Sequence, residues 1–231
     1  MASDPTVLIV TANIGGFEEP KRPVAQASDG IGVIDYKVVT ETLPSRKSLS
    51  PRLRAKLPKM FAWDLYPGFD RYIWMDASMW MVRPDGVLWF LDQIGSGEIA
   101  LFRHPSRTSI QQEADYLRVK MEEPGPDREY LCARYEGEDL AGQLRAIAQP
   151  GFVDDRLYAG TAFCYRPTAP IQAAMREWWW HTSRFHCNDQ LSLPFALWTT
   201  GCDVRVIDEN IFRASRLTRR RGYDPERRVA S

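Results

Sequence analysis

Short apolar runs alternate with amphipathic stretches along most of this 231-residue chain. Runs rich in β-branched and aromatic residues are typical of strands, whereas apolar residues that recur every three or four positions are typical of helices. The pattern predicts strands at 6–10, 31–40, 72–75, 98–102, 156–165 and 204–207. It predicts helices from 51 onward, at 86–91, 108–120 and 137–148, from 170 onward and up to 198. Strands that alternate with helices predict a single α/β domain with a mixed, mostly parallel sheet flanked by helices.

The run 72–75 ends directly at Asp76, which Ala77 and Ser78 follow. It is continuously apolar or aromatic, as expected of a strand buried on both faces of a mostly parallel sheet. An aspartate after such a strand lies at the carboxyl edge of the sheet, where open α/β folds bind ligands. Asp76 is therefore a candidate ligand-binding acid. The alternative is an aspartate that only caps the following turn.

A helix is predicted to begin after Ser50, because serine is a favoured N-cap and Pro51 suits the first helical position. Pro58 lies inside this helix and should kink or interrupt it. One helix face is apolar and is expected to pack on the sheet. The other face is either a solvated surface or a cluster that contacts a diphosphate, and it carries Arg52, Arg54, Lys56 and Lys59.

Two further segments are expected at the ligand-binding edge. The loop 11–16 contains the adjacent glycines Gly15 and Gly16, which permit a ligand to approach the backbone, but it lacks the GxGxxG pattern of dinucleotide-binding loops. The strand 98–102 runs into polar donors at 103–107.

The stretch 121–128 is rich in proline, glycine and charge and is expected to be the most mobile loop of the chain.

Composition narrows the functional classes. Thirty Lys and Arg residues balance thirty Asp and Glu residues, so net charge gives no general attraction to nucleic acid or membrane. Positions 1–5 lack the pattern of a signal peptide and no apolar run reaches transmembrane length, which favours a cytoplasmic protein. The four cysteines form no CxxC pair, which argues against zinc and for reduced thiols.

Five short motifs follow one another along the chain: IGGFE at 14–18, LRAKLPK at 53–59, YIWMDAS at 72–78, HPSR at 104–107 with Glu113, and NDQLSLP at 188–194. In this order they resemble the family of glycosyltransferase-like domains catalogued as DUF616. The resemblance covers nearly the whole chain, from Val10 to Phe212. It implies a GT-A fold, which is a Rossmann-like domain that transfers a sugar from a nucleotide donor, expected here to be a UDP-sugar. The expected donor-binding residues are Thr11, Asn13, Thr40, Lys56, Lys59, Asp76 and Ser78.

GT-A transferases resemble one another in a DxD motif after a buried strand, and residues 76–78 occupy that place. Ser78 stands where the motif has its second acid. A divalent ion, Mn²⁺ or Mg²⁺, would therefore be held by Asp76 with one charged ligand fewer, and its binding should be loose. Alternatively, Lys56 and Lys59 neutralise the leaving diphosphate without a metal.

The pair Asp189–Gln190 resembles the DQ pair that GT-A transferases of the glycogenin-like group carry near the anomeric carbon, and these two residues are the catalytic candidates. An acid there could stabilise an oxocarbenium-like transition state, orient the acceptor or act as a base, and the resemblance favours retention of configuration. The alternative role of Asn188 or Asp189 is a helix N-cap. The expected substrate-binding residues on the acceptor side are His104, Arg107, Glu113, Tyr158 and Thr161. Arg107 is expected either to pair with Glu113 or to hold an acidic group of the acceptor.

Residues 1–212 are expected to form the transferase domain and 213–231 an arginine-rich, flexible tail. The leading hypothesis is transfer of a sugar to a glycan, a small molecule or a protein. The basic tail permits a second hypothesis, in which the acceptor is a modified nucleic acid, although a solvated chain end has the same composition. Ser78 permits a third, in which the protein binds a nucleotide sugar without turning it over.

Overall fold

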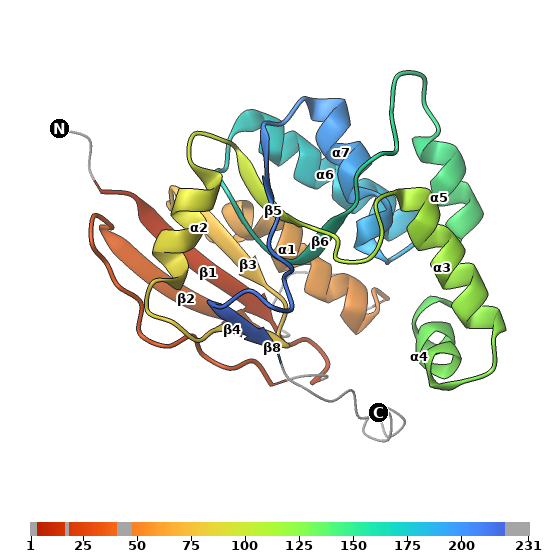
Figure 1. The fold of residues 1–231 in the computed structure, drawn as a ribbon, viewed down its shortest axis with the longest axis horizontal. Coiled ribbons are helices and arrows are strands. Elements are labelled where there is room, and N and C mark those ends of the chain that lie inside the picture. The colour runs from red at the N-terminus through yellow and green to blue at the C-terminus, as the bar shows by residue number, and fades with distance from the viewer. Residues whose placement is uncertain (1–3, 17–18, 41–47, 220–231) are drawn as a thin grey trace.

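The computed structural model describes residues 4–16, 19–40 and 48–219, and it confirms the predicted α/β architecture (Figure 1). A six-stranded sheet has the strand order β2-β1-β3-β6-β5-β7. Its strands are β1 (Thr6–Ala12), β2 (Val33–Val39), β3 (Arg71–Met75), β5 (Ile99–Arg103), β6 (Tyr158–Tyr165) and β7 (Val204–Ile207). Strand β1 is parallel to β2 and β3, and β5 is parallel to β7, whereas β6 is antiparallel to both of its neighbours. The sheet is therefore mixed and mostly parallel.

Helices cover both faces of this sheet. They are α1 (Pro51–Leu65), α2 (Gly86–Ile94), α3 (Ile110–Glu122), α4 (Pro126–Tyr135), α5 (Leu140–Ile147), α6 (Ala169–Arg184) and α7 (Leu193–Thr200). Alternate residues of the central strands face opposite layers: Ile73 packs in the cluster that contains α2, and Trp74 in the cluster that contains α1 and α6. Burial on both sides explains why the run 72–75 is continuously apolar.

Helix α1 begins as predicted. The Ser50 hydroxyl accepts a hydrogen bond from the backbone N–H of Leu53 at 3.2 Å, and Pro51 occupies the first turn. The helix is kinked at Phe61, three residues after Pro58, whose ring cannot donate the usual backbone hydrogen bond. The kink keeps α1 against β1 and β3, so that Lys59 is buried at 2% exposure.

A smaller helical layer packs around α7 and extends the fold beyond the sheet (Figure 1). The stretch 121–128 is largely part of this layer, because α3 ends at Glu122 and α4 begins at Pro126. The loop that was expected at 121–128 is therefore mostly helical, and only 123–125 lie between the helices. Proline at the start and acids in the first turn are helix-start signals that outweigh the proline and glycine content.

The beginning of the predicted tail is part of the fold. Strand β8 (Leu217–Arg219) pairs antiparallel with β4 (Met79–Met81), and Ala214 and Leu217 are buried in the core. The remainder of the arginine-rich segment lies outside the described residues.

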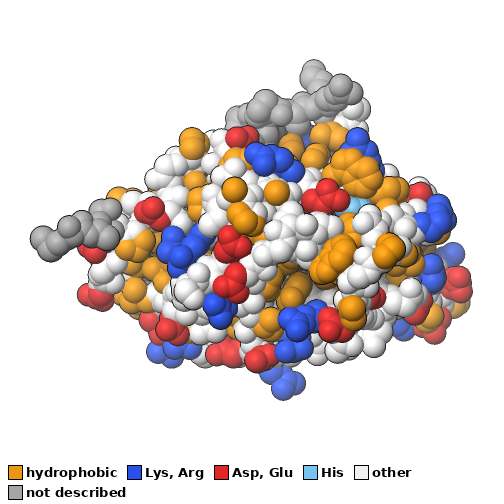
Figure 2. Space-filling model, turned by 90° about the horizontal axis from the view of Figure 1, so that it is seen from above, with side chains coloured by type: hydrophobic (Ala, Val, Ile, Leu, Met, Phe, Trp, Pro, Cys, Tyr) orange, Lys and Arg blue, Asp and Glu red, His pale blue; other side chains and the backbone are white. Residues whose placement is uncertain are grey.

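Charges of both signs are interspersed with apolar side chains on the face shown in Figure 2, in keeping with the balanced composition. Among the described residues, the helices are all too short or too polar to cross a lipid bilayer.

Candidate active site

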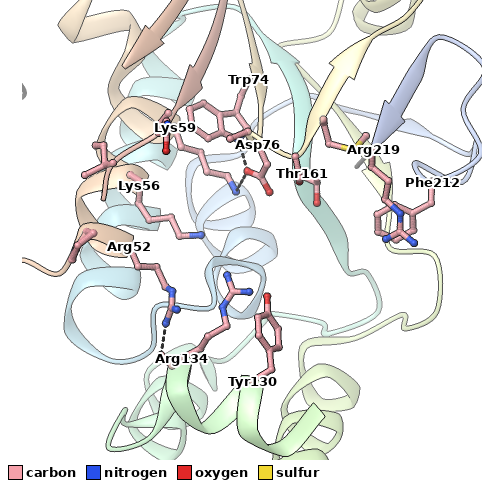
Figure 3. Close-up of a pocket in the computed structure, with 18 residues that line it drawn as sticks. Arg52, Lys56, Lys59, Trp74, Asp76, Tyr130, Arg134, Thr161, Phe212 and Arg219 are labelled. Carbon is pink, nitrogen blue, oxygen red and sulfur yellow. Dashed lines mark hydrogen bonds and ion pairs between the residues drawn. The ribbon is translucent and has the colours of Figure 1, made fainter. Parts of the chain in front are cut away.

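A cleft opens at the carboxyl ends of β1 and β3, on the edge of the sheet where Asp76 was expected. It consists of two adjoining compartments of about 330 and 480 Å³. Residues from α1, α4, β6 and β8 line both compartments, as does Asp76 at the end of β3. Figure 3 shows the smaller compartment. The shared lining residues are Arg52, Lys56, Lys59, Asp76, Tyr130, Arg134, Thr161, Phe212 and Arg219.

Asp76 lies where β3 ends and faces this cleft. Its backbone N–H donates to the carbonyl of Thr161 on the adjacent antiparallel strand at 2.8 Å. The indole N–H of Trp74 donates to Asp76 Oδ1 at 2.8 Å and orients the carboxylate. Only the backbone carbonyl of Asp76 serves the following turn, by accepting from the N–H of Met79. The side chain is therefore turned to the cleft and not used as a cap.

Asp189 lies on the other side of the cleft and is held by two lysines of α1. Lys56 Nζ and Lys59 Nζ each approach Asp189 Oδ2 to 2.6 Å. Lys59 Nζ also lies 3.6 Å from Asp76 Oδ1, so one buried ammonium links the two carboxylates. The cap of the short 3₁₀ helix η1 (Asp189–Leu191) is Asn188, whose side chain accepts from the N–H of Gln190 at 3.2 Å.

The electrostatics of this cluster keep Asp189 ionised. Burial alone would raise the pKa of Asp189, but the attraction of Lys56 and Lys59 outweighs it and holds the pKa well below the ordinary range. For Lys59, burial lowers the pKa, but Asp189 and Asp76 together raise it above the ordinary value. Burial lowers the pKa of Lys56 more than Asp189 raises it. A carboxylate held in this way is a weak proton acceptor and a permanent negative charge.

Because Gly160 of β6 has no side chain, the ammonium group of Lys59 has room beside this strand and reaches Asp189. A Cβ atom at this position would lie 3.2 Å from Lys59 Nζ and 3.8 Å from Asp189 Oδ1. Strand β6 is irregular here, because the residues opposite Leu101 and Phe102 are Phe163 and Ala159.

Arg107 and Glu113 form the ion pair that was one of the two alternatives, and they also line the larger compartment. Glu113 Oε1 accepts from the side-chain amide of Asn188 at 2.9 Å, which ties the pair to the turn that carries Asp189. Arg107 stacks over the ring of Tyr116, with its guanidinium carbon 4.1 Å from the ring centroid. His104 lies behind Arg107, where its Nδ1 accepts from the Arg107 backbone N–H at 3.0 Å. Burial and then the charge of Arg107 lower the pKa of His104.

The structure brings together most of the predicted site residues. Those that line the cleft are Asn13, Lys56, Lys59, Asp76, Ser78, Arg107, Glu113, Thr161, Asp189 and Gln190. Four others do not line it: Thr11, Thr40, His104 and Tyr158. Thr11 is buried beside the cleft, and Thr40 is exposed after β2. The carbonyl of Tyr158 accepts from the Gln190 side-chain amide at 3.3 Å, so Tyr158 supports the site through its backbone.

Some residues that line the cleft were not expected there from the sequence. Tyr130 and Arg134 come from α4, and Phe212 and Arg219 from the C-terminal segment (Figure 3). Tyr130 and Arg134 are four residues apart, a spacing that places them on the same side of a helix once α4 is recognised. Nothing local marks Phe212 or Arg219, because their position depends on the pairing of β8 with β4.

The cleft residues do not fit a divalent metal held by protein ligands. Within the described residues, no three side chains of His, Cys, Asp or Glu converge. Asp76 offers one carboxylate, which already contacts the ammonium group of Lys59, and Asp189 is engaged by two lysines. A hard divalent cation binds several oxygen ligands, and an adjacent ammonium repels it.

Comparisons with known proteins find no similar sequence and only weakly similar structures. No family model matches this chain, so the resemblance to DUF616 stays a prediction. A search of curated protein sequences also finds no match.

The similar solved structures include two glycosyltransferases, both at low sequence identity. One is a glycosyltransferase involved in the glycosylation of the major capsid of PBCV-1, with 7% identity, a TM-score of 0.46 and coverage of 96% of both chains. The other is the apo structure of the bifunctional glycosyltransferase WbbM, with 11% identity and a TM-score of 0.45. That similarity covers 89% of this chain but 39% of WbbM. Because both TM-scores are below 0.5, we derive the function below from the residues of the cleft.

Proposed function

We propose that this chain is a glycosyltransferase that moves a sugar from a nucleotide-sugar donor to an acceptor hydroxyl group, with a UDP-sugar as the donor. The observation that carries the proposal is the pair Asp76 and Asp189, joined by the buried Lys59 in a cationic cleft at the carboxyl edge of the sheet. An anionic diphosphate is attracted to such a cleft, while the ionised carboxylates suit the positive charge that develops on the sugar. The resemblance to the DUF616 family supports the same activity and a GT-A fold.

The charge balance of the cleft favours an anionic ligand. Six cationic side chains line its two compartments against three carboxylates. The cations are Arg52, Lys56, Lys59, Arg107, Arg134 and Arg219, and the carboxylates are Asp76, Glu113 and Asp189. A ligand with two negative phosphates would bring this excess of positive charge close to balance.

In the proposed reaction, the bond between the anomeric carbon and the terminal phosphate oxygen breaks, and its electron pair leaves with the nucleoside diphosphate. The acceptor oxygen bonds to the anomeric carbon, and its proton passes to the leaving phosphate. Asp189 acts here as a fixed negative charge beside the developing oxocarbenium ion, because its depressed pKa makes it a poor base. Gln190 positions the turn through its bond to the Tyr158 carbonyl.

The test is to incubate the protein with UDP-glucose, UDP-galactose and UDP-N-acetylglucosamine, and to measure UDP release and sugar products by mass spectrometry. We expect slow release of UDP without an acceptor and a loss of about 100-fold or more in Asp76→Asn. Asp208→Asn is the matched control, since Asp208 also pairs with a basic residue but lies outside the cleft. Donor binding without any turnover would instead identify a nucleotide-sugar-binding protein.

A further inference from the structure

We infer that the guanidinium groups of Arg52 and Arg219, and not a divalent metal ion, neutralise the diphosphate of the donor. This inference rests on the proposed function and specifies how the cleft meets the leaving group. The basis of the inference is that some charged side chains of the cleft already form ion pairs with other residues of the chain, whereas others do not.

The two lysines are committed to carboxylates. Lys59 is 2% exposed and bridges Asp76 and Asp189, and Lys56 holds the same oxygen of Asp189. Removing either lysine from Asp189 to serve a phosphate would leave the buried carboxylate less compensated, which is costly in a low-dielectric site. Arg107 is committed in the same way to the buried Glu113. These three cations therefore balance the three carboxylates of the cleft.

Arg52 and Arg219 form no ion pair with any carboxylate among the described residues, so their charges remain for a ligand. Arg52 lies on α1 one turn before Lys56, and its Nη1 donates to the carbonyl of Arg134 on α4 at 2.6 Å. That bond holds the guanidinium at the cleft while leaving its other N–H groups to donate. Arg219 stacks on Phe212 with its guanidinium carbon 4.2 Å from the ring centroid. This contact occupies one face of the guanidinium group and leaves the N–H groups along its edge available to donate hydrogen bonds.

The two arginines approach the cavity from different walls. In Figure 3, Arg52 comes from α1 on one side and Arg219 from β8 on the other, with Asp76 and Lys59 between them at the head of the cavity. A planar guanidinium can bind two phosphate oxygens at once. Two such groups on opposite walls suit a diphosphate, whose charge a metal ion would otherwise bridge.

The test is to measure the binding of inorganic pyrophosphate and of UDP by calorimetry, in EDTA and again with Mn²⁺. We expect both probes to bind in EDTA, with little change on adding Mn²⁺. Arg52→Gln and Arg219→Gln should each raise the Kd about tenfold or more, because a charge-assisted bidentate contact is lost. Arg219→Lys should give a smaller loss, because it keeps the charge but not the fork.

Arg184→Gln is the matched control: Arg184 stacks on Trp180 at 4.7 Å, as Arg219 does on Phe212, but lies outside the cleft. Asp76→Asn gives the sharpest contrast. It removes a negative charge near the phosphates and should leave pyrophosphate affinity in EDTA unchanged or increased, whereas a metal-bridged site would lose binding. Thermal unfolding verifies that each variant is folded.

Binding that requires Mn²⁺ and disappears in Asp76→Asn would overturn the inference and leave the transferase proposal intact. Wild-type affinity in both arginine variants would also overturn it. Conversely, pyrophosphate binding in EDTA without turnover of any nucleotide sugar would support the arginine site and contradict the transferase proposal.

Discussion

Lys59 and Asp189 form a buried ion pair in the cleft, and the chemistry that we propose depends on it. Lys59 is almost fully buried, and a buried ammonium is tolerated only when carboxylates pair with it. Its two partners lie 113 residues apart in the sequence, at 76 and 189. The ion pair thus joins the end of β3 to the turn before α7, and any change in one partner affects the other.

The first prediction concerns Asp189→Asn. Asparagine keeps the size of the side chain, and Asn188 still caps η1, but Lys56 and Lys59 lose their shared carboxylate. We expect the free energy of unfolding to fall by about 3 kcal/mol, as when one partner of a buried pair is removed. Urea unfolding measures the change, and the exposed Asp208→Asn should change it by less than about 0.5 kcal/mol.

A double-mutant cycle separates the pairing from the effect of the substitution itself. Lys59→Met in the Asp189→Asn background should cost much less than Lys59→Met alone, because the Lys59 charge has already lost its closer partner and keeps only Asp76 at 3.6 Å. Additive costs would mean that the two side chains are not coupled.

The second prediction is a pH dependence. The folded-state pKa of Asp189 lies below that of an unfolded aspartate, about 4, because two lysines stabilise the ionised form. Its contribution to stability is therefore present above about pH 4 and is lost as the pH falls from there through the folded-state pKa. Urea unfolding between pH 3 and 7 should show a steeper acid decline in the wild type than in Asp189→Asn. Parallel profiles would contradict the assignment of this linkage to Asp189.

At the scale of elements, the site depends on how closely α1 and β6 approach. Helix α1 presents Arg52 and Lys56 at a four-residue spacing on one face, with Lys59 nearby on the buried side. Strand β6 runs antiparallel to β3 and brings Gly160 and Thr161 to the end of β3 where Asp76 lies. The glycine is needed because any larger residue would contact the Lys59 ammonium.

The third prediction is that Gly160→Ala lowers UDP release about tenfold while unfolding free energy changes by less than about 1 kcal/mol. The new Cβ would displace Lys59 Nζ by a few tenths of an ångström, and loss of unfolded-state entropy offsets part of the strain. Gly86→Ala is the control, since its Cβ would crowd Met81 at 2.9 Å, away from the cleft. Equal loss of turnover in both variants would show that crowding, and not Lys59, is responsible.

At the scale of the whole molecule, the C-terminal segment closes one wall of the cleft. Strand β8 pairs with β4, and Phe212 and Arg219 line both compartments. We therefore propose that the folded unit extends at least to Arg219, beyond the boundary at 212 that the sequence predicted.

The fourth prediction compares two truncations. A chain that ends at Arg219 should retain the thermal midpoint and pyrophosphate affinity of the full chain. A chain that ends at Phe212 loses the buried Ala214 and Leu217 together with Arg219. Its thermal midpoint should fall by about 5 °C or more, and its pyrophosphate affinity should fall with it. If the shorter chain equals the full one in both measurements, residues 213–219 are not part of the functional unit.

Local sequence patterns determined the elements and their order. The run 72–75 predicted a doubly buried strand and the edge position of Asp76, and the signals at Ser50, Pro51 and Pro58 predicted the start and the kink of α1. These signals are reliable because each depends only on neighbours along the chain: a continuous apolar run, an N-cap residue and the missing N–H group of a proline. The resemblance also indicated Lys56 and Asp189 as site residues, although it did not indicate that they contact each other.

Only the tertiary structure decided which of these side chains meet. Lys56 and Asp189 are 133 residues apart, and their contact depends on the packing of α1 against β1 and β3 and on the turn before α7. The same is true of Arg219, which reaches the cleft because β8 pairs with β4. Thr40 was expected at the donor site and is exposed outside the cleft, because a position after a strand does not specify the distance between strand ends. The sequence around a polar residue does not show which distant side chain it contacts. That pairing is determined only when the sheet and its helices pack.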